Sequence, residues 1–152
     1  MEENQMITTT DFQLIIAVPS TPEDAFDAVC RVSDWWVTDI EGETRGVGSA
    51  FIVRFGDPYV EFKIVEFAPG ETASWLVTDC YLPWLEDKTE WTGTTVRFDI
   101  SATNDGSQVT LTHIGLVREL ECFESCEQGW QQYFQNSLKT LIQEGTGAPQ
   151  VR

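Results

Sequence analysis

The C-terminal part of the sequence contains a long amphipathic helical pattern, which limits the folds that the chain can adopt. Between Glu127 and Glu144, apolar residues recur at helical spacing, and Gly145 supplies a C-terminal stop signal. The apolar stripe consists of Trp130, Phe134, Leu138, Leu141 and Ile142. One helix cannot bury such a stripe by itself, so we expect it to lie on the apolar face of a sheet.

The segment from Gly46 to about Leu116 predicts that sheet. Apolar and polar residues alternate in about five stretches, which indicates strands with one buried face. The turn sequences GDP, APGE and NDG separate neighbouring stretches. Such short turns favour an antiparallel meander, because parallel neighbours need long crossover connections. The predicted inward residues are Phe51, Val53, Phe55, Val60, Phe62, Ile64, Trp75, Val77, Val96, Phe98, Ile100, Val109, Leu111 and His113.

The N-terminal part predicts one more strand and then a helix. Phe12, Leu14, Ile16 and Val18 alternate along the strand. The start of the helix is marked by a cap at Ser20 or Thr21, by Pro22 in the first turn, and by Glu23 at capping-box spacing from Ser20. The expected buried face consists of Ala25, Phe26, Val29 and Cys30. The helical region ends near Trp35 and Trp36. These elements predict an α+β fold of about six antiparallel strands curled around a long C-terminal helix, with one or two short helices after the first strand.

The chain length and charge limit the domain count and the partners. A chain of 152 residues fits one domain, so we predict a single domain over residues 1–152 with its core at about 7–145. The formal net charge of -16 disfavours nucleic acid and anionic membrane surfaces, because both are bound mainly through Lys and Arg. The absence of basic residues before Arg31, and of any apolar run near about 18 residues, predicts a cytoplasmic protein with free thiols.

Aromatic residues gather at the inward positions. The chain has six Trp, and several of them fall on predicted inward faces, together with Phe residues. A curved sheet around a helix can leave space between them, so these rings could line an apolar ligand pocket or could simply fill the core. The predicted ligand-pocket residues are Trp35, Trp36, Phe51, Phe62, Trp75, His113, Trp130 and Phe134.

His113 is the only histidine of the chain and lies on the inward face of the last strand. It could be a general acid or base in the pocket, or a core histidine hydrogen-bonded to a neighbouring group. Together with Cys122 and Cys126 it offers at most three soft ligands, whereas structural zinc generally takes four, so we predict no metal site and no cofactor. The acidic neighbours of the two cysteines disfavour a reactive thiolate, so we predict no catalytic residue there.

Trp84 and Trp91 flank the polar sequence LEDKTE between two predicted strands. This hairpin could cover the mouth of the cavity. Alternatively, it is a longer surface hairpin whose rings pack on their own neighbours.

The order of these elements resembles a known family. The resemblance extends over Ile7 to Gly145 and rests on four segments: TPEDAFDAV and DWW after the first strand, LTHIGL in the last strand, and GWQQYFQNSLKTLIQEG in the long helix. Together they resemble the START-like (SRPBCC) superfamily, in the branch similar to the C-terminal domain of the activator of heat-shock-protein-90 ATPase. The resemblance implies a helix-grip fold with a deep cavity between sheet and long helix, and no catalytic motif that can be carried over.

Members of this superfamily bind hydrophobic small molecules, act as cyclases or other enzymes, or interact with partner proteins. We therefore expect a protein that binds an apolar or aromatic small molecule. The alternatives are an enzyme of the cyclase or hydrolase kind that uses His113 as acid or base, and a protein-interaction module, such as a homodimer or a chaperone partner.

Overall fold

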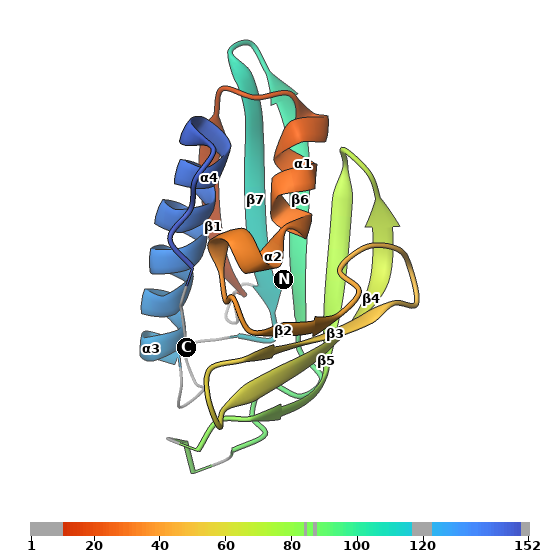
Figure 1. The fold of residues 1–152 in the computed structure, drawn as a ribbon, viewed down its shortest axis with the longest axis vertical. Coiled ribbons are helices and arrows are strands. Elements are labelled where there is room, and N and C mark those ends of the chain that lie inside the picture. Colours follow the sequence, from red (N-terminus) through yellow and green to blue (C-terminus); the bar gives the residue numbers. More distant parts are fainter. Residues whose placement is uncertain (1–10, 84, 87, 117–122, 150–152) are drawn as a thin grey trace, which may run out of the picture.

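The computed structural model describes residues 11–83, 85–86, 88–116 and 123–149, and its central feature is a curved antiparallel sheet with helices packed on it (Figure 1). In the described part the sheet has seven strands in the order β1-β7-β6-β5-β4-β3-β2. The strands are β1 (Phe12–Val18), β2 (Ile40–Gly42), β3 (Ala50–Arg54), β4 (Tyr59–Ala68), β5 (Thr72–Tyr81), β6 (Thr95–Thr103) and β7 (Gly106–Ile114). This confirms the predicted α+β helix-grip fold.

The helices follow the predicted order. α1 (Pro22–Cys30) and α2 (Val32–Trp35) come after β1, and α1 packs on β6 and β7. The long C-terminal helix consists of α3 (Phe123–Trp130), η2 (Gln131–Leu138) and α4 (Lys139–Glu144), and it runs alongside β1 in Figure 1. It ends at Gly145, whose φ of 85° is the left-handed conformation that glycine adopts most readily.

Two details differ from the sequence prediction. β2 is a seventh strand that the sequence did not indicate, because three residues are too few to show an alternating pattern. The cap of α1 is Thr21, whose hydroxyl accepts a hydrogen bond from the backbone N–H of Asp24 at 3.1 Å. Glu23 then lies one position too early for a capping box, so the predicted pairing of Ser20 with Glu23 is wrong.

Two bulges curve the sheet around the helices. The register of β4 against β5 shifts between Glu61 and Phe62, and again between Ile64 and Glu66. A bulge bends its strand and increases the local twist, so β4 and β5 turn toward the long helix. The buried residues Val60, Phe62 and Ile64 keep their side chains on the inner face across the first shift.

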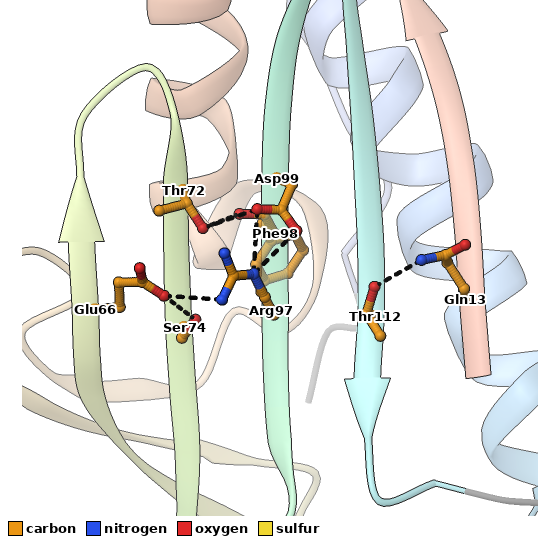
Figure 2. Close-up of polar contacts among 8 residues, drawn as sticks. All are labelled: Gln13, Glu66, Thr72, Ser74, Arg97, Phe98, Asp99 and Thr112. Atoms are coloured by element: carbon orange, nitrogen blue, oxygen red, sulfur yellow. Dashed lines mark hydrogen bonds and ion pairs between the residues drawn. The ribbon is translucent and has the colours of Figure 1, made fainter. Parts of the chain in front are cut away.

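The outer face of the sheet is polar, as Figure 2 shows. Arg97 bonds to Glu66 at 3.1 Å on one side and to Asp99 at 3.0 Å on the other, and Glu66 also accepts a hydrogen bond from Ser74. Arg97 and Asp99 alternate along β6 with the buried Val96, Phe98 and Ile100. The apolar core therefore lies on the other face, between the sheet and the helices.

The middle of the long helix is a π-helix, which explains the spacing of its buried residues. Trp130, Phe134 and Leu138 are four residues apart and are all buried. In an α-helix, each step of four residues rotates the side chain by about 40° around the axis. The π-helix η2 takes more residues per turn, so a step of four residues falls short of a full turn instead of exceeding one, and the three side chains stay within one apolar stripe.

Ser137, in η2, connects the long helix to two other segments. Its hydroxyl donates to the carbonyl oxygen of Trp35 at 2.7 Å and accepts from the backbone N–H of Ala148 at 2.7 Å. The side chain is buried, so water cannot replace either bond readily.

We predict that Ser137→Ala lowers the free energy of unfolding by about 1–3 kcal/mol, because it removes the donor to the carbonyl of the buried Trp35 and also breaks the bond from the backbone N–H of Ala148. Urea unfolding followed by tryptophan fluorescence measures this loss. The matched control is Asn136→Ala, at an exposed neighbouring position, which should change stability by less than about 0.5 kcal/mol. Equal effects of the two substitutions would contradict the role assigned to Ser137.

Candidate functional site

A pocket of about 380 Å³ opens where three segments meet at the lower end of the molecule in Figure 1. The segments are the turn between β3 and β4, the loop between β5 and β6, and the first turns of the long helix. Trp36, immediately after α2, completes the wall. The lining residues are Trp36, Phe55, Pro58, Val60, Leu82, Trp91, Ser125, Cys126, Gly129, Trp130 and Tyr133.

Five of the residues that line the pocket are aromatic. The rings of Trp36 and Trp130 lie 4.9 Å apart, and Trp91 stacks on Trp130 at 6.1 Å with an interplanar angle of 12°. Phe55 packs against Trp36 from the turn between β3 and β4, at 6.0 Å. The lining residues that the structure describes include no charged side chain. Such a wall suits an uncharged ligand with a flat ring.

His113 lies behind this wall and links two of its residues, Trp130 and Trp91, through hydrogen bonds. The Nε1–H of Trp130 donates to His113 Nδ1 at 3.1 Å, and His113 Nε2 lies 2.9 Å from the hydroxyl of Thr94. That hydroxyl donates to the carbonyl oxygen of Trp91 at 2.6 Å. An indole N–H can only donate, so Nδ1 must be the acceptor and the imidazole proton must be on Nε2.

This arrangement keeps His113 neutral. Its side chain is fully buried, and burial lowers the pKa of the imidazole to about 3. A second proton on Nδ1 would meet the indole proton of Trp130, so protonation would break the bond to the helix. The geometry therefore supports a core histidine that is hydrogen-bonded on both nitrogens, and it gives no support to an acid or base role.

Trp91 joins the β5–β6 loop to the long helix. Its Nε1–H donates to the sulfur of Cys126 at 3.2 Å, and its ring meets the ring of His113 edge-on at 4.6 Å. Trp91 is buried, so this part of the loop closes over the sheet and contributes to the pocket wall. Trp84, the other predicted lid residue, lies outside the described residues.

The described cysteines do not gather with other ligands. Cys30 and Cys80 are free thiols, and burial raises the pKa of Cys30 to about 11. Within the described ranges, no three His, Cys, Asp or Glu side chains lie close enough together to hold a metal ion. Cys122 lies outside these ranges.

The structure separates the eight predicted pocket residues into two groups. Trp36 and Trp130 line the pocket. The other six are packed in the core with at most 1% of their surface exposed: Trp35, Phe51, Phe62, Trp75, His113 and Phe134. Phe51 is in contact with Phe62 at 5.1 Å and with Trp75 at 5.0 Å, so these rings fill the space that they face. A ligand role for the eight residues stays a prediction.

Several pocket residues were not among those predicted from the sequence. Cys126, Gly129 and Tyr133 share one face of the helix with Trp130, because their numbers follow the helical spacing i, i+3, i+4 and i+7. This spacing was the available signal, and it extends the helical pattern to Cys126, one residue before Glu127; Ser125 lies beside it in α3. Phe55, Pro58 and Val60 come from the β3–β4 turn and β4, and Leu82 follows β5, so their meeting with the helix depends on the fold.

Comparison with known proteins identifies related sequences and structures. The family model described as "Activator of Hsp90 ATPase homolog 1-like protein" matches residues 21–143. The solution structure of the Aha1 dimer from Colwellia psychrerythraea is 23% identical, with a TM-score of 0.75 over 91% of this chain and 99% of that one. No sequence among the curated proteins matches the chain.

Two further structures show the same fold at lower identity. Protein SSP2350 from Staphylococcus saprophyticus is 15% identical, with a TM-score of 0.71 over 93% of this chain and 98% of that one. DynU16, a protein in the dynemicin biosynthetic locus, is 15% identical, with a TM-score of 0.69 over 92% of this chain and 50% of that one. In the described part of the chain, none of the helices has the length and apolar character needed to cross a membrane.

The neutral state of His113 predicts a pH dependence of stability. In the unfolded chain its pKa is about 6.5, so below that pH the unfolded state binds one more proton than the folded state. The free energy of unfolding should therefore fall by about 1.5 kcal/mol between pH 6.5 and pH 5. Urea unfolding across this range measures the slope.

His113→Gln is the matched variant for this prediction. Glutamine can accept from Trp130 with its oxygen and donate to Thr94 with its nitrogen, but it does not titrate. Since His113 is the only histidine, the variant should lose the slope between pH 6.5 and pH 5. A wild-type protein whose stability is unchanged over this range would contradict the assignment.

Proposed function

Since the chain belongs to the family of Activator of Hsp90 ATPase homolog 1-like proteins, with the START-like helix-grip fold, we propose that it binds an uncharged, ring-containing small molecule in the pocket beside Trp36 and Trp130. The observation that carries this proposal is the pocket itself, whose volume of about 380 Å³ is typical of small-molecule sites. Its wall presents ring faces from three segments, so a flat ring could stack against more than one of them.

The hydrogen bonds of His113 favour binding over acid–base catalysis in this proposal. Both ring nitrogens are hydrogen-bonded to protein groups. Trp130 and Trp91 line the pocket, and His113 lies behind them. His113 then acts on the ligand only through the position of Trp130. The alternative of a cyclase or hydrolase with His113 as acid or base has no support from these contacts.

Gly129 provides a direct test of the pocket. It lies on the pocket wall near the end of α3, where the long helix continues into η2, and a Cβ added there would meet no atom within 4 Å. We predict that Gly129→Leu fills part of the pocket and weakens binding of a flat aromatic probe, such as fluorene, by at least about tenfold while the protein stays folded. Isothermal titration calorimetry measures the affinity, and circular dichroism confirms folding.

The matched control is Gly129→Ala. A methyl group is too small to occupy the pocket, and alanine favours a helix over glycine by about 0.5–1 kcal/mol. This variant should therefore keep probe binding and become more stable by about that amount in urea unfolding. If the leucine variant bound fluorene as well as the wild type did, the probe would lie elsewhere. If no flat aromatic probe bound the wild type, the proposed function would fail.

A second proposal is that the protein forms a homodimer. It is supported by the similar structure from Colwellia psychrerythraea, which is that of an Aha1 dimer. We expect sedimentation equilibrium at increasing protein concentration to approach twice the chain mass of 17.2 kDa. A mass of one chain at every concentration would contradict a dimer, and it would leave the ligand proposal unaffected.

A further inference from the structure

The indole N–H groups around the pocket differ in whether they have a hydrogen-bond acceptor. Trp35 donates to the carbonyl oxygen of Val29 at 3.1 Å, Trp91 donates to Cys126, and Trp130 donates to His113. Among the described residues, the Nε1–H of Trp36 has no hydrogen-bond acceptor, although only 4% of the side-chain surface of this residue remains exposed. A buried donor without an acceptor is unfavourable, because it has lost its bonds to water.

The surroundings of Trp36 offer it ring contacts only. Its indole lies 4.9–6.0 Å from the rings of Trp35, Phe55, Phe62 and Trp130. Trp36 also lines the pocket, so we take the pocket as the space from which a polar atom of a ligand reaches this donor. An apolar pocket with one donor of this kind would orient a ligand as well as bind it.

We propose that the ligand is a flat aromatic compound with a carbonyl oxygen, and that this oxygen accepts a hydrogen bond from the Nε1–H of Trp36. The inference rests on the proposed function and narrows its ligand class. A hydrocarbon of the same shape would stack against the same rings but would leave the donor without an acceptor. The carbonyl therefore provides a difference in affinity that apolar contact alone does not provide.

The matched probes are fluorene and 9-fluorenone, which share a tricyclic shape and differ by one carbonyl group. Calorimetry with the wild type and with Trp36→Phe gives four dissociation constants. The ratio of the fluorene constant to the fluorenone constant should be about 3- to 10-fold larger in the wild type than in the variant. Comparing ratios cancels the difference in hydrophobicity between the probes and the loss of ring area in the variant.

Phe55→Leu is the control variant for this comparison. It removes part of an apolar ring from the pocket wall without removing a donor. Both probes should bind it more weakly by the same factor, so its ratio should equal that of the wild type.

Nuclear magnetic resonance on the wild type tests the same bond without any substitution. Fluorenone should move the indole N–H proton of Trp36 downfield, whereas fluorene should cause only the ring-current shift that the two probes share. Trp75 serves as an internal reference: its indole N–H also has no acceptor among the described residues, but it does not line the pocket. Its signal should respond equally to the two probes.

The outcomes separate the two proposals. If both probes bind, the ratio is the same in the wild type and Trp36→Phe, and the Trp36 signal responds equally to both, the pocket is a binding site but the carbonyl inference is wrong. If neither probe binds the wild type, the proposed function fails and the inference fails with it. A larger ratio in the wild type, with a downfield shift confined to Trp36 and fluorenone, supports both.

Discussion

The hydrogen bond from Trp130 to the neutral imidazole of His113 belongs to a chain of bonds that connects the long helix, strand β7 and the loop before β6. Through Nδ1 the imidazole holds the first turns of the long helix, and through Nε2 and Thr94 it holds the end of the loop before β6. The bond from Trp130 requires an unprotonated Nδ1, so the neutral state of the buried imidazole and the position of the helix depend on each other. A glutamate or lysine at this position would be a buried charge without a counter-charge among these contacts.

The pocket stays open because the helix face above it carries small side chains. Where the helix packs along β1, Phe134 and Leu138 are buried in the core, and the ring of Phe134 contacts Phe98 of β6. One to two turns earlier, the same helix presents Cys126 and Gly129 between the larger Trp130 and Tyr133. The rings of Trp36 and Trp91 are held at the sides by their own contacts and do not close the gap. Along this one helix, large inward side chains therefore fill the core, and small side chains one to two turns earlier leave the pocket open.

Most of the fold could be predicted from the sequence because burial follows the period of each element. The inward residues of β3 to β7 alternate, and the stripe of the long helix follows a helical period, so both patterns are local. Whether an inward residue lies in the filled core or on the pocket wall does not follow from the local sequence pattern. Phe51 and Trp36 both face the interior, but only Trp36 lies on the pocket wall, since that depends on where helix and sheet separate. Trp91 joins the wall from a loop without periodicity, and β2 is too short to show one. The prediction of a single domain over the whole chain stays a prediction.

The π-helical segment explains how one helix can present two differently directed faces. Cys126, Gly129, Trp130 and Tyr133 are at α-helical spacing, and all four line the pocket. The buried residues after Trp130 follow a spacing of four, which an α-helix would rotate progressively away from the sheet. In the wider η2 a step of four residues falls short of one turn, so the rotation changes sense after Trp130; the pocket face ends near Tyr133 while the core face continues to Leu138. Trp130 belongs to both faces, and this position is why its indole can hold His113 on one side and line the pocket on the other.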